Sequence, residues 1–189
     1  KNIPHRSGLG GGSMNAAAIF KYFLKKYNLK LNKTEIFKIT SKIGSDTIIG
    51  MHKNSTIKLG NSKIKFAKIK RSMHLLLIKP SFGCSTKSIY SNVKTYSKSQ
   101  INFNNNKFLS NKYLFNLSND LEKPAFKKYP KLKKIKLFME NLDQILFSRM
   151  TGSGSTIIGY FKSKKDCQNA QKILKKKYKN YWCILSKTI

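Results

Sequence analysis

The chain has 189 residues, of which 40% are hydrophobic and 12% aromatic, so it can form one or two folded domains and is not a disordered polypeptide. Lys and Arg number 39 against 7 Asp and Glu, which gives a net charge of +32. The lysines are spread along the whole chain, and arginine, the better reader of bases and phosphates, occurs only as Arg6, Arg71 and Arg149, so the charge is weak evidence for nucleic-acid binding.

The cysteines and the apolar runs narrow the class of protein further. Cys84, Cys167 and Cys183 are odd in number and lack the spacing of a metal site, which indicates reduced core thiols in a cytoplasmic protein. No apolar run approaches the roughly 20 residues of a membrane span, and no segment resembles a signal peptide. We therefore expect a cytoplasmic protein that binds neither membranes nor nucleic acid, while its oligomeric state stays open.

Residues 4–18 form a glycine-rich segment that leads into a helix; they read Pro-His-Arg-Ser-Gly-Leu-Gly-Gly-Gly-Ser-Met-Asn-Ala-Ala-Ala. Glycine lets the backbone approach a bulky ligand and adopt positive φ. The helix start adds unpaired N–H groups and the positive end of a dipole, which suit an anion. The segment predicts a phosphate site, although it is neither a Walker nor a Rossmann motif, and a plain flexible turn is the alternative.

The next elements have clear helix and strand patterns. Apolar residues at helical spacing predict a helix of about four turns from Ser13. A second helix, capped by Asn32 or Thr34, ends at Gly44, and Asp46 then precedes a short apolar run. Two strands are predicted at residues 56–59 and 64–69, with the turn at Gly60-Asn61.

A continuous apolar run at residues 73–78 predicts a buried strand, and we place a domain boundary near it, between residues 1–70 and 71–189. The segment 87–93 predicts a helix, and residues 97–112 predict a polar loop or an eroded helix. An amphipathic helix follows over residues 132–142.

A second glycine-rich stretch, residues 151–155, leads into a predicted strand at 156–161. Ser163 and Asp166 have the spacing of a capping box for a last helix, and residues 181–185 predict a closing strand. The order beyond residue 78 predicts an α+β domain whose helices cover one face of an antiparallel sheet.

Five motifs in order carry a resemblance to a known family. The stretch Pro4-x-x-x-Gly8-Leu9-Gly10-Gly11-Gly12-Ser13-x-Asn15-Ala16-Ala17 resembles the ATP-binding motif of the GHMP kinases. Four further elements resemble those of one branch, the diphosphocytidyl-methylerythritol kinases: Asp46 after Gly-Ser, residues 80–90, residues 119–122 and residues 149–154. The resemblance implies the α+β, two-domain GHMP-kinase fold, with an incomplete amino-terminal ATP-binding domain at 1–70 and a carboxy-terminal ferredoxin-like domain at 71–189.

The resemblance also implies an activity: an ATP- and Mg²⁺-dependent kinase that phosphorylates the 2-hydroxyl of a cytidine diphosphate-linked methylerythritol in non-mevalonate isoprenoid synthesis. Asp46 would be the catalytic base, Tyr90 would stack on the cytosine, and Ser13 would lie near the metal. The second glycine-rich stretch would lie against the first and close the site. The residues that would bind the nucleotide are Pro4, His5, Arg6, Ser7, Gly8, Leu9, Gly10, Gly11, Gly12, Ser13 and Met14.

Each of these roles also has a purely structural alternative. Without the family, Asp46 is more often a helix cap or turn residue, Tyr90 a core residue and the second glycine-rich stretch a hairpin turn. Asp120 is the second candidate base, although its setting suggests a structural role. A homoserine or mevalonate type of GHMP kinase is the alternative function, and a basic RNA-binding protein is the less favoured one.

The chain also departs from the family pattern. Met14 stands where a second serine is usual, and residues 47–50 replace a Val-Pro-Val-Phe-like run. Because Lys1 lies directly upstream of the phosphate motif, we expect a fragment that has lost its amino-terminal portion and the family's catalytic lysine. Asp46 would then lack a cationic partner, and the fragment could be inactive on its own.

Overall fold

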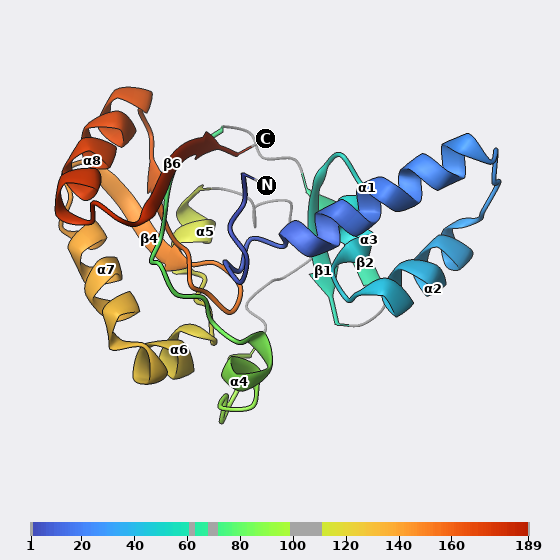
Figure 1. The fold of residues 1–189 in the computed structure, drawn as a ribbon, viewed down its shortest axis with the longest axis horizontal. Coiled ribbons are helices and arrows are strands. Elements are labelled where there is room, and N and C mark those ends of the chain that lie inside the picture. Colours follow the sequence, from blue (N-terminus) through green and yellow to red (C-terminus); the bar gives the residue numbers. More distant parts are fainter. Residues whose placement is uncertain (1, 61–62, 68–71, 99–110, 189) are drawn as a thin grey trace. The chain divides into compact units, whose positions relative to one another are not determined.

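The computed structural model describes residues 2–60, 63–67, 72–98 and 111–188 (Figure 1). The chain divides into two compact units, one formed by Gly10–Ile69 and the other by Lys1–Leu9 together with Lys70–Ile189. The glycine-rich segment is thus shared between them, because its first residues belong with the second half of the chain. Each unit mixes helices with antiparallel strands, which confirms the α+β class.

The unit Gly10–Ile69 contains three helices and a hairpin: α1 (Gly11–Lys26), α2 (Lys33–Ile43), α3 (Thr47–Gly50), β1 (Ser55–Leu59) and β2 (Lys63–Ala67). Asn32 caps α2: its side chain accepts from the backbone N–H of Glu35 at 3.0 Å, and the Glu35 carboxylate accepts in return from the N–H of Asn32 at 2.7 Å. This capping box confirms Asn32, one of the two predicted caps. The turn predicted at Gly60-Asn61 lies partly outside the described residues.

Helix α3 is held tightly against α1 within this unit. A Cβ placed on Gly50 would lie 2.6 Å from the Cβ of Ala17, so a glycine is needed where the two helices cross. Lys21 donates from its ammonium group to the carbonyl oxygen of Gly50 at 2.7 Å. The sequence pattern predicted only an apolar run after Asp46, because a helix of one turn has no periodicity to detect.

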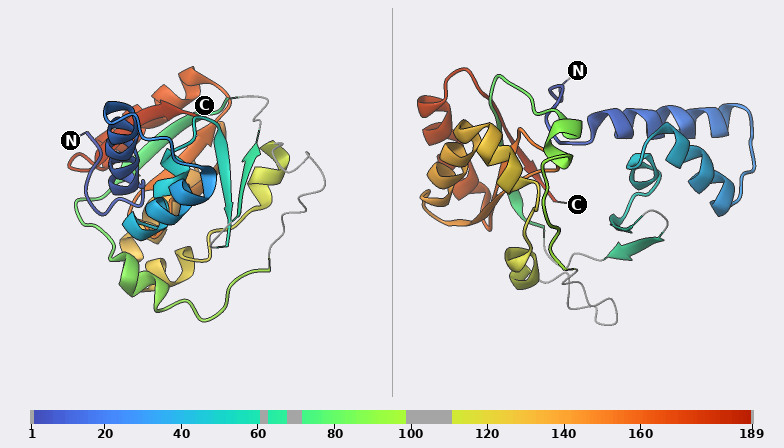
Figure 2. Two further views of the ribbon diagram at one scale, coloured as in Figure 1. Left: turned by 90° about the vertical axis from the view of Figure 1, so that its right-hand side faces the viewer. Right: turned by 90° about the horizontal axis from the view of Figure 1, so that it is seen from below.

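The second unit contains a four-stranded antiparallel sheet with strand order β4-β5-β3-β6. Helices α7 and α8 lie on one face of it and contact its strands (Figures 1 and 2). The strands joined by helical connections are not neighbours in the sheet: β5 lies between β3 and β4, and β3 lies between β5 and β6. This is the ferredoxin-like topology. The elements of this unit are β3 (His74–Lys79), α4 (Thr86–Tyr90), α5 (Asn111–Asn116), α6 (Glu122–Lys128), α7 (Pro130–Glu140), β4 (Ile145–Met150), β5 (Ile157–Phe161), α8 (Lys164–Lys177) and β6 (Trp182–Lys187).

Strand β4 was not predicted from the sequence, which yielded only three strands in this unit. In β4 a polar residue occupies a position where an apolar one is usual, because Ser148 is buried. The neighbouring apolar residue, Phe147, instead stacks on Tyr160 with ring centroids 4.1 Å apart. The pairing register also shifts between Ile145 and Phe147. An irregular register and an inward-facing serine remove the alternation on which strand prediction depends.

The core of this unit lies between the sheet and helices α7 and α8. All three cysteines are buried free thiols, as predicted. The sequence did not predict helix α6, because Pro124 lies within it. Proline is tolerated in the first turn of a helix, where its missing N–H group costs no helical hydrogen bond. The fully buried apolar residues of the core include Leu76, Ile78, Leu132, Ile135, Met139, Ile157, Phe161 and Leu174.

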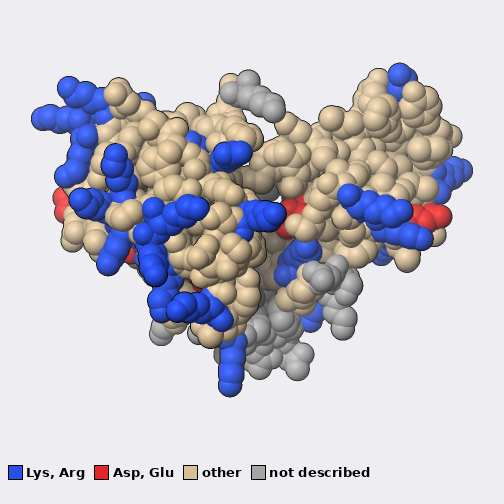
Figure 3. Space-filling model, turned by 60° about the horizontal axis from the view of Figure 1, so that its bottom comes forward, with Lys and Arg blue, Asp and Glu red and all other residues tan. Residues whose placement is uncertain are grey.

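Basic side chains far outnumber acidic ones in the chain. Figure 3 shows Lys and Arg scattered over one face of the molecule, with Asp and Glu sparse. Among the helices in the described ranges, none is both long and apolar enough to cross a membrane. Most of the polar stretch 97–112 lies outside the described residues.

Candidate active site

The first loop, residues 4–9, packs in the unit that contains the four-stranded sheet. Gly8 has a φ of +74°, a left-handed value that glycine adopts without strain. A Cβ added to Gly8 would overlap the carbonyl oxygen of Thr151 and lie 2.9 Å from that of Gly154. Both the backbone conformation and the close approach of another segment therefore require glycine at this position.

The second loop, residues 151–155, connects β4 to β5 and is the segment that approaches Gly8. It turns through two glycines with left-handed φ, +50° at Gly152 and +85° at Gly154. The backbone N–H of Thr151 donates to the carbonyl of Thr156 at 3.0 Å, which closes the turn. The loop is therefore a hairpin connection in its own right.

Two hydrogen bonds join the first loop to the second loop and to Thr156, the residue that directly follows it. The backbone N–H of Thr156 donates to the carbonyl of Ser7, and the Thr151 hydroxyl donates to the carbonyl of Gly8, each at 3.1 Å. Ser7 is buried by this contact. The prediction that the second glycine-rich stretch lies against the first is confirmed. The same stretch is also a hairpin turn, which was the alternative interpretation.

The second loop also contacts the helix that carries Tyr90. The hydroxyls of Thr86, in the first turn of α4, and Ser153 lie 2.9 Å apart and share a hydrogen bond. Tyr90 is the last residue of α4 and its side chain is exposed at 49%, so it does not have the core role that its residue type would suggest. The first loop, the second loop and the helix that carries Tyr90 thus belong to one compact unit and are linked by hydrogen bonds.

A buried lysine fixes the turn that precedes α4. The ammonium group of Lys79 donates to the carbonyls of Pro80 and Phe82, both at 2.9 Å. Burial lowers the pKa of Lys79. The Ser155 hydroxyl donates to the same Phe82 carbonyl at 2.8 Å, so this turn is tied to the second loop as well.

The remaining residues of the predicted nucleotide segment, 10–14, form the start of α1 in the other unit. Gly10 occupies the N-cap position with left-handed φ, and no described side chain caps the helix. The first turn holds no acidic residue and contains Ser13, which is half-buried, and Met14, which is exposed. Its backbone N–H groups and positive dipole end are arranged to favour a phosphate.

Asp46, the predicted base, lies in the same unit as the start of α1. It occupies the N-cap position of α3, but its side chain makes no capping hydrogen bond. Its carboxylate is 57% exposed and accepts a long hydrogen bond of 3.3 Å from the Ser45 hydroxyl. Because α3 packs on α1, where Met14 borders Gly50, Asp46 is carried on a helix that contacts the first turn of α1.

Asp46 does have a cationic neighbour, contrary to the expectation from the sequence. The ammonium group of Lys58, on β1, lies 4.0 Å from a carboxylate oxygen of Asp46 and donates to the carbonyl of Ser45 at 2.8 Å. The expectation failed because it considered only the family's catalytic lysine. On a chain with 39 Lys and Arg residues, a single lysine in a strand gives no signal of its own.

Asp120, the second candidate base, has a structural role. Its carboxylate accepts from both the backbone N–H and the hydroxyl of Ser97, each at 2.9 Å. These bonds tie the segment after α4 to the one before α6. Within the described residues no three His, Cys, Asp or Glu side chains gather as a metal site, so a metal here would need ligand oxygens from a bound phosphate.

The chain is similar to known kinases along its whole length. Residues 1–54 match the family described as GHMP kinases N terminal domain, and residues 103–180 match GHMP kinases C terminal. A 4-diphosphocytidyl-2-C-methyl-D-erythritol kinase of Pelagibacter ubique is 50% identical over 189 residues, which is 100% of this chain and 67% of the relative. A kinase of the same name from Thermodesulfovibrio yellowstonii is 34% identical, over 100% of this chain and 68% of the relative.

Solved structures agree on the fold. A crystal structure of a 4-(cytidine 5'-diphospho)-2C-methyl-D-erythritol kinase matches 98% of this chain and 68% of its own, with a TM-score of 0.77 and 22% identity. A homoserine kinase from Cytophaga hutchinsonii matches 100% of this chain and 68% of its own, with a TM-score of 0.72 and 15% identity. The chain therefore belongs to the GHMP kinase family, in the group of the 4-diphosphocytidyl-2-C-methyl-D-erythritol kinases.

Proposed function

We propose that the chain carries out the ATP-dependent phosphorylation of the 2-hydroxyl of 4-diphosphocytidyl-2-C-methyl-D-erythritol, a step of non-mevalonate isoprenoid synthesis. The observation that carries this proposal is the pair of glycine loops joined through Gly8 and Thr151, immediately before an uncapped helix start. The relatives that match the chain over its full length bear the name of this activity.

The nucleotide would bind along residues 4–14. Glycines leave the backbone N–H groups accessible, and the first turn of α1 adds the positive end of its dipole without an acidic side chain to oppose it. Thr151 and Thr156 support this arrangement, because they hold Gly8 and Ser7 by their carbonyls and leave the N–H groups of these two residues out of that contact.

Mg²⁺ would be held by phosphate oxygens with help from the Ser13 hydroxyl. The donor set fits a hard cation only in part, since Ser13 supplies one oxygen and the remaining ligands would come from phosphate and water. When bound, the ion would neutralise the charge that develops on the transferred phosphoryl group. Met14, in place of a second hydroxyl, instead packs against α3 at Gly50.

Asp46 would act as the base. As the acceptor hydroxyl oxygen attacks the γ-phosphorus, the bond to the β–γ bridging oxygen breaks and the hydroxyl proton passes to the Asp46 carboxylate. Its 57% exposure leaves the carboxylate accessible to a substrate, and the Lys58 ammonium group lies 4.0 Å from it. Only weak local bonds would have to be displaced when a hydroxyl approaches.

Tyr90 would stack on the cytosine of the acceptor. Its position at the end of α4, half-exposed and on a helix bonded to the second loop, would place the base-binding ring in the unit that also holds the first loop. We further propose that the chain is divided near residue 70 into the two domains of GHMP kinases and that it acts in the cytoplasm, where buried free thiols persist.

The test compares acceptors. The chain alone, and the chain joined to the part of the Pelagibacter ubique relative that the match leaves out, are each supplied with Mg-ATP and one acceptor at a time. We expect ADP release only with 4-diphosphocytidyl-2-C-methyl-D-erythritol, together with a product phosphorylated at the 2-hydroxyl. Turnover with homoserine or mevalonate instead would contradict the acceptor, and salt-sensitive RNA binding without any turnover would contradict the kinase.

A further inference from the structure

Asn119 makes an unusual set of contacts with the end of β4 and the second loop. Its side-chain amide nitrogen donates to the carbonyl oxygens of Met150 and Gly152, both at 2.8 Å. An asparagine amide has two N–H donors, and these two bonds use both. The side-chain oxygen accepts from the backbone N–H of Leu121 at 3.0 Å, which fixes the rotamer and the orientation of the amide.

Glu122 holds the same stretch from the other side. One carboxylate oxygen accepts from the backbone N–H of Met150 at 2.7 Å, and the other pairs with the Lys136 ammonium group at 3.2 Å. Lys136 also pairs with Glu140 at 3.2 Å. Burial lowers the pKa of Lys136, but Glu122 and Glu140 together raise it above its usual value, so the cation stays charged and keeps the carboxylate in place.

Thr151 lies between the two carbonyls that Asn119 binds. Its hydroxyl bonds to the carbonyl of Gly8 at 3.1 Å, and the approach of the two backbones at this point leaves no room for a Cβ on Gly8. A shift of Thr151 would therefore move Gly8. The bonds form a continuous path from Asn119 through the second loop to the first loop.

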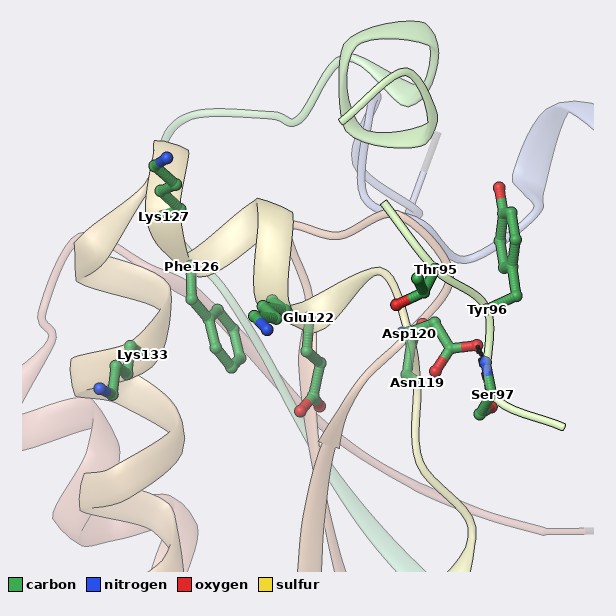
Figure 4. A pocket seen from close by; sticks show the side chains of 10 residues that line it. Thr95, Tyr96, Ser97, Asn119, Asp120, Glu122, Phe126, Lys127 and Lys133 are labelled. Carbon is green, nitrogen blue, oxygen red and sulfur yellow. Dashed lines mark hydrogen bonds between the residues drawn. The ribbon is translucent and has the colours of Figure 1, made fainter. Parts of the chain in front are cut away.

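The neighbouring side chains serve other purposes. In Figure 4 the side chain of Asp120 faces Ser97, to which dashed lines join it, and the segment lines an open cavity of about 700 Å³ with Phe126 and several lysines. None of the residues proposed to bind nucleotide lines this cavity. Within the segment 119–122, Asn119 and Glu122 are thus the side chains with hydrogen bonds to the end of β4 and the second loop.

We propose that Asn119 is a positioning residue for the nucleotide: it holds the second loop in the conformation that sets the first loop against the phosphates. This inference rests on the proposed nucleotide site at residues 4–14. Both partners of the Asn119 amide are carbonyl oxygens, so the residue must donate twice, and aspartate, which is the same size but accepts only, would repel both.

The test is the substitution Asn119→Asp, with Asn141→Asp as the matched control. Asn141 also donates from its amide to a backbone carbonyl, that of Leu137 at 2.9 Å, but at the end of α7 and away from both loops. The affinity of the chain for Mg-ATP is measured by calorimetry without any acceptor, and backbone hydrogen exchange is measured in the same samples. We expect Asn119→Asp to weaken ATP binding by about tenfold or more and to speed exchange in residues 5–9 and 151–156, with Asn141→Asp like the wild type.

Asn119→Ala is the second variant, because it removes the two donors without adding a charge. We expect a smaller loss of affinity of the same kind, since water can reach the Gly152 carbonyl. Affinity within twofold of the wild type for Asn119→Asp would overturn the inference, and so would faster exchange spread evenly over the sheet. A wild-type chain that binds ATP but phosphorylates no acceptor would contradict the proposed acceptor while leaving this inference standing.

Discussion

The hydroxyl of Thr151 donates a hydrogen bond to the carbonyl oxygen of Gly8 over 3.1 Å, although the two residues are 143 positions apart in the chain. This bond joins the first glycine-rich loop to the hairpin between β4 and β5. A loop of glycines is flexible by composition, and here its conformation is set by contact with another element. The conformation of this loop therefore depends on a segment that is distant in the sequence.

Gly8→Ala should disrupt this contact more than a substitution at another glycine with positive φ. At Gly8 the added methyl would overlap the Thr151 carbonyl, whereas at Gly10, with a φ of +67°, no described atom lies within 4 Å of it. We expect Gly8→Ala to lower the free energy of unfolding by about 3 kcal/mol or more and Gly10→Ala by about 1 kcal/mol. Urea denaturation of both variants measures the difference, and equal losses would show that the close approach is unimportant.

Tyr90→Leu should weaken binding of the cytidine-containing acceptor without affecting the nucleotide. Stacking of a base on an aromatic ring contributes about 1–3 kcal/mol, so we expect the acceptor KM to rise by about tenfold or more while the KM for ATP stays unchanged. Tyr90→Phe keeps the ring and should behave like the wild type. Steady-state kinetics with each substrate varied separately gives both constants. Equal losses for Leu and Phe would argue against stacking.

The buried thiol of Cys84 should be protected from alkylation until the protein unfolds. Burial raises the pKa of Cys84 from 9.0 to about 11, so the folded protein retains a proton that the unfolded chain releases between these values. Stability is thus unaffected by this group below pH 9 and falls as the pH rises towards 11. At pH 8 we expect iodoacetamide to react with folded Cys84 at least about a hundredfold more slowly than with the denatured chain, as followed by mass spectrometry.

The long helices of the fold follow readily from the sequence, because α1, α2, α7 and α8 have regular apolar spacing. Strand β4 does not, since Ser148 faces inward and Phe147 outward. The cap at Asn32 is a local feature that the sequence predicts. The position of the Phe147 ring depends on Tyr160 in the neighbouring strand. Such a feature cannot be predicted until the pairing of the strands is known.

The same division applies to the candidate site. The glycine loops and Asp46 could be selected from their motifs, whereas the contacts of Lys58 with Asp46 and of Asn119 with Met150 join separate elements of the structure. Lys58 is one of many lysines, so its residue type does not single it out. The two partners of Asn119 are backbone carbonyls, which every residue has, so the sequence gives no sign of them. Such roles are defined by tertiary structure alone, so the sequence pattern could not assign them.

The most direct test of the kinase is the substitution Asp46→Asn, measured beside Asp143→Asn, which removes another exposed carboxylate. Asp46 makes only long or exposed contacts, so its loss should leave folding intact. In the chain joined to the part of the Pelagibacter ubique relative that the match leaves out, we expect turnover with 4-diphosphocytidyl-2-C-methyl-D-erythritol to fall about 100- to 10,000-fold for Asp46→Asn and to stay at the wild-type level for Asp143→Asn. Undiminished turnover in Asp46→Asn would contradict its role as the base, and a folded wild-type protein that binds ATP but shows no acceptor-dependent turnover would contradict the proposed reaction.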